Sequence, residues 1–233
     1  MKKRIVTIVA AFGFFLSAFI TSSAMAGGFG FGVMGSGLHI ATSGNETNTS
    51  SDQVNSSDQT HSGALASIFA EYSIGDQDHH GMTFGISYSP MRAQIGSGSR
   101  ADSRSDVAED SNDSGTYKAK ANVRGATTLY VEPTLMWGNK GVYFKGGLAR
   151  IKVESLEEIT LGENSSVYPN EWVGGYLFGL GMTSRFDSGL FYKLEAVRTV
   201  YHEVSMESMT GNKNIIRATP KTIAANISFG YRF

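Results

Sequence analysis

Apolar and polar side chains alternate with a period of two along most of the chain after residue 27. In the clearest stretch, residues 117–137, odd positions are apolar or small, whereas even positions carry charges such as Lys118 and Glu132. Successive side chains of a strand point to opposite faces, so this pattern predicts a β-strand with one apolar and one polar face. The stretch exceeds the usual strand of a soluble domain, and it is long enough to cross a bilayer, which takes about 9–11 residues.

Seven further stretches predict strands in the same way, and the connections between strands alternate in length. The predicted strands cover residues 29–41, 62–74, 82–94, 117–137, 142–153, 172–185, 190–201 and 219–233. Three connections are short and turn-like (75–81, 138–141, 186–189), and four are long and polar (43–61, 96–116, 154–171, 203–218). Membrane barrels have short periplasmic turns and long outer loops. The chain is therefore predicted to be all-β, an eight-stranded antiparallel up-and-down transmembrane β-barrel with four long extracellular loops. Pro133 lies inside a predicted strand, where we expect a local bulge.

The first 26 residues have a different pattern. Lys2, Lys3 and Arg4 precede an apolar run over residues 5–20, and Ala24-Met25-Ala26 has the small-x-small form of a cleavage site. This is the layout of a secretory signal peptide, so we expect a signal at residues 1–26 and a barrel domain at 27–233. No later run of about 18 apolar residues predicts a membrane-spanning helix.

Overall composition argues against several classes of partner and site. The formal net charge is −1 and the chain has no cysteine. The charge gives no reason to expect nucleic acid as a partner. The lack of cysteine excludes disulfides and thiolate metal sites.

Alternation alone does not say which face lies inside, because a soluble barrel is apolar inside and polar outside. Here the apolar face carries aromatic residues towards both ends of the strands, like the two interfacial belts of membrane barrels. Those near the short turns are Phe29, Phe31, Trp137, Phe229, Tyr231 and Phe233, and those near the long connections are Tyr88, Tyr117, Trp172 and Tyr176. We therefore expect the apolar face to contact lipid and the charged face to line the lumen.

The last predicted strand carries Ala225, Ile227, Phe229, Tyr231 and Phe233 at alternate positions. This resembles the C-terminal strand of bacterial outer-membrane barrels, which implies that Phe229, Tyr231 and Phe233 form a signal for the barrel-assembly machinery. With eight strands, the mature chain resembles the small barrels typified by the OmpA transmembrane domain, OmpX and the neisserial opacity proteins. The resemblance implies a monomer in the outer membrane whose loops act in envelope integrity, adhesion or surface interaction.

The charged face predicts a charge network inside the barrel. Its expected members are Glu71, Lys118, Lys120, Arg124, Glu132, Lys145, Arg185, Lys193, Glu195 and Arg232. Eight strands leave an interior just wide enough for side chains, so we interpret the set as a salt-bridged core, with Glu132 and Glu195 as central partners. The excess of basic residues implies trapped water or anions, because unpaired buried charge is costly. A narrow channel for small solutes is the alternative.

Five other basic residues fall on the outward face near the long connections. They are Arg92, Arg150, Lys152, Arg198 and Lys221. Long basic side chains there can reach the headgroup layer, and clustered cationic groups suit phosphate. We expect a belt that binds the phosphates of lipopolysaccharide; ordinary interfacial solvation is the alternative.

The remaining motifs predict no catalytic residue, cofactor or metal. Gly30 to Gly35 match the G-x-G-x-x-G pattern without the helix that a dinucleotide site needs, which favours close packing in a strand. His202, Glu203 and Ser205 bear a partial resemblance to an outer-membrane lipid A deacylase but lack its motif context, so a lipid A-modifying enzyme is a lesser alternative. The third long connection is acidic from Glu154 onwards, which indicates a soluble loop or, alternatively, cation bridging.

Overall fold

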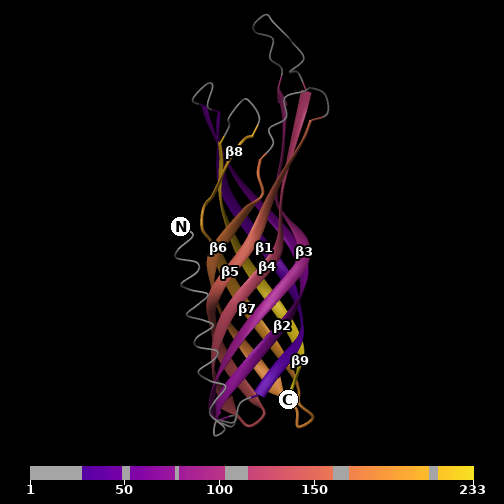
Figure 1. Cartoon of the computed structure of the whole chain (residues 1–233), viewed down its shortest axis with the longest axis vertical. Helices are drawn as coiled ribbons and strands as arrows, with labels where there is room; N and C mark the ends of the chain where they lie inside the picture. The colour runs from indigo at the N-terminus through magenta and orange to yellow at the C-terminus, as the bar shows by residue number, and fades with distance from the viewer. Residues whose placement is uncertain (1–27, 49–52, 77–78, 103–114, 160–167, 210–214) are drawn as a thin grey trace, which may run out of the picture.

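The described residues form one antiparallel sheet that closes on itself. The computed structural model describes residues 28–48, 53–76, 79–102, 115–159, 168–209 and 215–233. Their strands are β1 (Gly28–Asn48), β2 (Gln53–Asp76), β3 (His80–Asp102), β4 (Gly115–Trp137), β5 (Lys140–Ile159), β6 (Glu171–Arg185), β7 (Leu190–Tyr201), β8 (Val204–Glu207) and β9 (Ile215–Arg232). Each of β1 to β6 pairs with the next strand, β7 pairs with β9, and β1 pairs with β9 to close the barrel (Figure 1).

This arrangement confirms the predicted eight-stranded up-and-down barrel. Eight strands, β1 to β7 and β9, form the wall within the described residues. The short β8 follows β7 after a break at His202 and Glu203, and it pairs with β9 above the β7 pairing. Residues 1–26, predicted to be a signal peptide, lie outside the described residues.

Much of the predicted long-loop sequence is strand. Residues 43–61 were expected to be a loop, but β1 runs to Asn48 and β2 starts at Gln53. The other three long connections are shortened in the same way, because β3, β4, β5, β8 and β9 extend into them. Backbone groups can pair across a hairpin whatever the side chains are, and a strand that is polar on both faces shows no alternation. The predicted loop boundaries were therefore wrong.

We call the part of the barrel nearer the short turns the lower barrel and the rest the upper barrel. The outer surface of the lower barrel is apolar, as expected for lipid contact. Phe144 is 68% exposed and Leu135 is 63% exposed, although both are large hydrophobic residues. Other outward apolar residues are Val33, Ile68, Ile86, Phe178, Leu180, Ile223 and Ile227. Trp137 near the short turns and Trp172 near the opposite end are also exposed, in agreement with two aromatic belts. Among the described residues, no helix is long and apolar enough to cross a membrane.

The interior changes character along the barrel axis. Near the short turns it is polar, and the buried residues there include Glu71, Ser73, Thr83, Glu132, Thr134, Lys145, Lys193 and Glu195. Towards the opposite end it becomes a hydrophobic core that includes Ile40, Ile95, Val123, Ile151, Val153, Val173, Val197, Tyr201 and Val204. The upper part of the barrel is thus apolar inside, like a soluble barrel. The expectation of one ionic interior along the whole cylinder was wrong for this part.

A β-bulge at Gly125 exchanges the two faces of β4. Glu132 and Tyr130, at even positions, are buried, but beyond the bulge Val123, at an odd position, is buried instead. Gly125 has a φ of 61°, and the pairing of β4 with β5 shifts between Arg124 and Thr127. A positive φ favours glycine, and a bulge inserts one extra residue into the strand. By contrast, Pro133 causes no register shift, so the bulge expected there is absent.

Strands β2 and β3 separate at Tyr88, a residue of the predicted upper aromatic belt. Their pairing ends at Ile68 and Tyr88, although both strands continue beyond these residues. At the point of separation, the Ser89 hydroxyl donates to the Ala66 carbonyl oxygen over 2.8 Å. Pro90 follows directly and has no backbone N–H to donate, which explains why the ladder stops there. Each strand keeps its other partner, β1 for β2 and β4 for β3.

Candidate functional site

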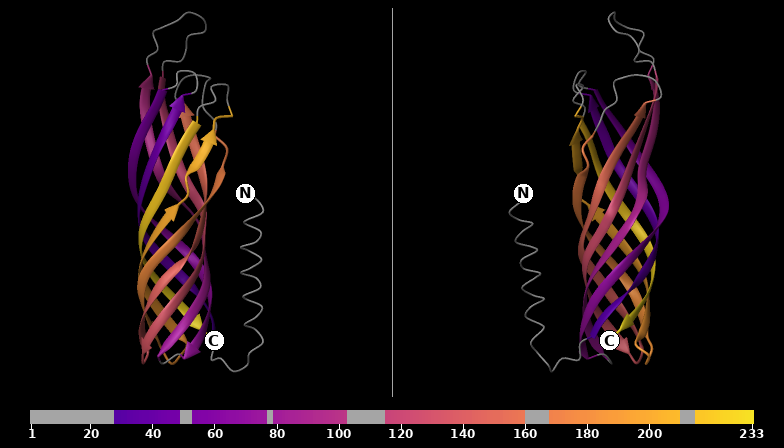
Figure 2. Two further views of the ribbon diagram at one scale, coloured as in Figure 1. Left: turned by 90° about the vertical axis from the view of Figure 1, so that its left-hand side faces the viewer. Right: turned by 45° about the vertical axis from the view of Figure 1, so that its right-hand side comes forward.

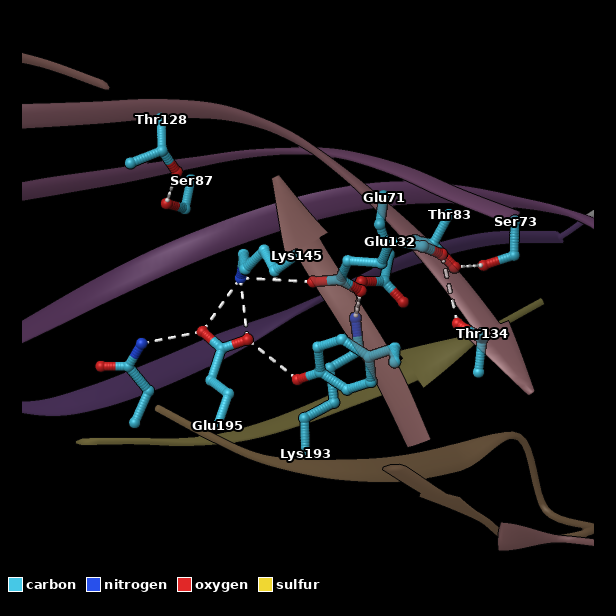
Figure 3. Close-up of polar contacts among 12 residues, drawn as sticks. Glu71, Ser73, Thr83, Ser87, Thr128, Glu132, Thr134, Lys145, Lys193 and Glu195 are labelled. Carbon is cyan, nitrogen blue, oxygen red and sulfur yellow. Dashed lines mark hydrogen bonds and ion pairs between the residues drawn. The ribbon is translucent and has the colours of Figure 1, made fainter. Parts of the chain in front are cut away.

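An alternating chain of buried charges crosses the lower lumen, and we call it the lumen network. Lys193 lies between two carboxylates: its Nζ is 2.7 Å from Glu132 Oε2 and also contacts Glu71. Lys145 connects the next pair, with Nζ 3.2 Å from Glu132 Oε1 and 2.9 Å from Glu195 Oε1 (Figure 3). The order Glu71, Lys193, Glu132, Lys145, Glu195 places an opposite charge beside each member.

Polar neighbours satisfy the two ends of the lumen network. At one end, Tyr143 Oη donates to Glu195 over 2.8 Å and Asn226 Nδ2 donates to the same carboxylate over 2.7 Å. At the other end, Arg232 Nη2 donates to Glu71 Oε1 over 2.7 Å. Because a buried charge is tolerated only when it is paired and hydrogen-bonded, these contacts allow the network to exist in a narrow interior.

Glycines on neighbouring strands make room for the rings that surround the network. A Cβ atom on Gly85 would overlap the ring of Tyr130, and one on Gly181 would overlap the ring of Tyr143. The Tyr130 ring lies 4.0 Å from Lys145 Nζ, a cation–π contact. The glycine-rich motif in β1 has a similar packing role, because a Cβ on Gly32 would overlap Phe69.

The structure brings together six residues of the predicted lumen set. They are Glu71, Glu132, Lys145, Lys193, Glu195 and Arg232, from strands β2, β4, β5, β7 and β9. Arg185, at the short-turn end of β6, lies near Arg232. Lys120 and Arg124 were expected in the lumen, but Lys120 is exposed and Arg124 faces outward because the Gly125 bulge changes the phase of β4. The side chain of Lys118 lies outside the described residues.

A second cluster of charges lies on the outer wall across β3, β4 and β5. The carboxylate of Glu154 is 2.5 Å from Arg124 Nε, 3.5 Å from Arg92 Nη2 and 4.0 Å from Lys152 Nζ. Glu154 was expected in an acidic loop, but it is a buried residue of β5 enclosed by these three cations. One carboxylate therefore attracts three cations, and the cluster keeps an excess of positive charge.

The other predicted belt residues lie on the outer surface of β5, β7 and β9. The guanidinium of Arg150 lies 4.1 Å from the Trp172 ring, which itself belongs to the upper aromatic belt. Arg198 on β7 and Lys221 on β9 are both exposed. With Arg124 added, we define the outer basic belt as Arg92, Arg124, Arg150, Lys152, Arg198 and Lys221. The alternation of residues along β4 did not predict an outward Arg124, because Gly125 is the sequence feature that indicates the bulge and a single glycine is a weak signal.

The histidines do not form a site among the described residues. His202 is exposed between β7 and β8, and its ring packs against Tyr176 with 6.5 Å between centroids. Glu203 and Ser205 are exposed as well. Within the described part of the chain, no group of three or more histidine, aspartate or glutamate residues could hold a metal ion.

The last strand contributes to the seam that closes the barrel. Phe229, Tyr231 and Phe233 are exposed on the outer face, and the rings of Tyr231 and Phe233 lie 5.1 Å apart. Phe31 of β1 lies 5.7 Å from Phe233, so aromatic contacts cover the junction of the first and last strands.

Solved structures resemble this barrel over nearly its whole length. The outer membrane protein OprG from Pseudomonas aeruginosa matches with a TM-score of 0.53 and 15% identity over 90% of this chain and 97% of that chain. The outer membrane protease OmpT from Escherichia coli matches with a TM-score of 0.51 and 6% identity over 91% of this chain and 99% of that chain. Ail of Yersinia pestis, in complex with the heparin analogue sucrose octasulfate, matches with a TM-score of 0.40 and 10% identity over 87% of this chain and 99% of that chain.

The fold is that of an outer-membrane β-barrel. The predicted resemblance to small outer-membrane barrels is therefore confirmed. No protein-family model and no curated protein sequence matches the chain at a significant level.

Replacing Lys193 with methionine will destabilise the barrel, because Glu71 and Glu132 would lose the cation between them. Breaking a buried ion pair costs about 3–5 kcal/mol in the free energy of unfolding. Urea unfolding in lipid vesicles, followed by tryptophan fluorescence, measures the loss. Adding Glu132→Gln will recover part of it, and Lys140→Met at an exposed position will change stability by less than about 0.5 kcal/mol. Equal stability of Lys193→Met and Lys140→Met would show that the network does not support the fold.

Proposed function

We propose that this protein is a closed outer-membrane scaffold that presents polar hairpins outside the cell. Its role would be envelope integrity, adhesion or another surface interaction, without catalysis. The observation that carries the proposal is that side chains fill the lumen, while the wall continues far beyond the lipid-facing band.

Two kinds of packing support a closed lumen. The lumen network connects strands from opposite sides of the lower barrel, and all five of its members are buried. The hydrophobic core with Ile40, Val153 and Tyr201 fills the barrel above it. Between them lies a cavity of about 110 Å³, lined in part by Ser67 and Leu38 and bordered by Lys145 and Glu195. An interior filled in this way favours a scaffold over a narrow channel.

The height of the wall supports a role in presentation. β2 has 24 residues and β3 has 23, whereas a bilayer-crossing strand needs about 9–11. About 13 extra residues, at about 3.3 Å each and a tilt of about 40°, raise the wall by about 33 Å. Figure 2 shows this upper wall, with β3 and β4 among its highest strands. Hairpins on such a wall stand clear of the membrane surface.

A planar bilayer recording tests the closed lumen. The folded protein will show no large steady conductance, because the lumen network and the hydrophobic core leave no wide water-filled path. Insertion is checked separately by brominated lipids, which will quench the exposed Trp137 and Trp172. A large steady conductance from protein that passes the quenching control would favour the solute channel instead.

Cysteine labelling tests the presentation of the hairpins, since the chain has no cysteine of its own. Ser56→Cys, at an exposed position in the upper part of β2, will react with a membrane-impermeant maleimide on intact cells. Asn139→Cys, exposed in the short turn between β4 and β5, will react only after the outer membrane is permeabilised. The reverse pattern, or labelling of both variants on intact cells, would contradict the proposed orientation.

We also propose that the outer basic belt binds the phosphate groups of lipopolysaccharide. One of its cations, Arg150, contacts Trp172 of the upper aromatic belt. The carboxylate of Glu154 lies close to Arg92, Arg124 and Lys152 and attracts all three. This attraction offsets part of the repulsion among the three cations before any ligand binds. Guanidinium groups are well suited to phosphate because they can bind it in a bidentate way.

Replacing the six belt residues with glutamine will reduce retention of lipopolysaccharide by at least about tenfold, because several charge-assisted hydrogen bonds of about 1.5–3 kcal/mol are lost. The measurement is binding of purified lipopolysaccharide to the folded protein, with dephosphorylated lipid as the comparison. Lys140→Gln with Arg217→Gln, which removes exposed charges away from the belt, is the control. Unchanged retention in the sixfold variant would leave ordinary interfacial solvation as the explanation.

The proposed function also requires export of the chain and its assembly into the membrane. Residues 1–26 would be removed as a signal peptide, and the mature chain would act as a monomer. The exposed aromatic residues Phe229, Tyr231 and Phe233 at the closing seam would be recognised by the barrel-assembly machinery.

A further inference from the structure

The interior of the lower barrel holds more positive than negative charge. Among the described side chains there, the carboxylates are Glu71, Glu132 and Glu195, and the cations are Lys145, Lys193, Arg185 and Arg232. Both lysines lie between two carboxylates, so they are fully compensated. The excess charge therefore falls on the two arginines at the short-turn end.

Arg232 is only partly satisfied by its protein neighbours. Its side chain is 10% exposed, and its Nη2 donates to Glu71. Its Nε and Nη1 are buried and make no hydrogen bond within the structure. A buried guanidinium nitrogen without an acceptor is unfavourable, so the protein by itself leaves the hydrogen-bonding capacity of Arg232 only partly used.

A pocket at the mouth of the barrel brings Arg185 to the same place. The pocket has a volume of about 520 Å³ and is lined by both arginines, the β6–β7 turn and Asn139 of the β4–β5 turn. The positive charges of Arg185 and Arg232 are close enough to oppose each other. Asp187 and the last residue, Phe233, also line the pocket, but both are exposed, and an exposed carboxylate compensates a buried charge only weakly.

We propose that Arg185 and Arg232 form a binding site for a small oxyanion at the periplasmic mouth of the barrel. Two guanidinium groups that face one pocket offer several N–H donors to the oxygens of a phosphate or carboxylate group. The anion would accept from guanidinium N–H groups of both arginines that border the pocket and would relieve the repulsion between them. The ligand would enter from the periplasm, because short turns face that side in membrane barrels.

The test uses the folded full-length barrel in a zwitterionic detergent, with inorganic phosphate as the probe. Phosphate will raise the unfolding midpoint above that in chloride at equal ionic strength, and ³¹P line broadening will show saturable binding. Arg185→Gln will weaken phosphate binding by at least about tenfold, since a charge-assisted contact is lost. Arg185→Lys keeps the charge but not the planar guanidinium group. Its affinity for phosphate will therefore lie between those of the unsubstituted protein and of Arg185→Gln.

A stability measurement with and without phosphate separates this role from a merely structural one. If Arg185 serves the anion, Arg185→Gln will lose the rise in unfolding midpoint that phosphate causes, whereas a structural role alone would lower the midpoint in phosphate and in chloride by the same amount. Lys140→Gln, at an exposed position of the β4–β5 hairpin, is the matched control and will bind phosphate normally. The proposal is overturned if phosphate stabilises no more than chloride, or if Arg185→Gln binds phosphate as tightly as the control.

Discussion

A backbone amide in the hydrocarbon core of a bilayer has no water to pair with, so every strand at that depth needs a neighbour on both sides. The pairing of β1 with β9 meets this need and turns the sheet into a cylinder. Where lipid no longer surrounds the wall, the constraint relaxes, and β2 and β3 separate at Ser89 and Pro90. The end of strict pairing thus coincides with the level of the upper aromatic and basic residues.

Closure with eight strands then determines what the interior can contain. The lumen is too narrow for a wide pore, and the side chains inside it must pack closely without steric overlap or unpaired charge. The lower part solves this with an alternating charge chain, in which Lys193 and Lys145 each contact two carboxylates. The upper part uses aliphatic packing around Ile40 and Val153. One cylinder therefore combines a membrane-type section with a section packed like a soluble barrel.

The bulge at Gly125 shows how one residue can redistribute charge. By exchanging the faces of β4, it brings Val123 into the hydrophobic core and places Arg124 on the outer wall beside Glu154. Without the shift, Arg124 would be a buried cation inside a hydrophobic core, which is strongly unfavourable. The same change of phase builds the outer basic belt and keeps the upper interior apolar.

The sequence by itself determined the strand count, the closed up-and-down topology and the apolar outer face, because period-two alternation and turn spacing are local properties. It also placed all five members of the lumen network on the polar face, since Glu71, Glu132, Lys145, Lys193 and Glu195 share the polar parity of their strands. Only the tertiary structure decided the phase of β4 beyond Gly125, the strand extensions into the long connections and the pairing of Glu154 with three cations. These features depend on contacts between strands, and alternation within one strand carries no information about a register shift in its neighbour.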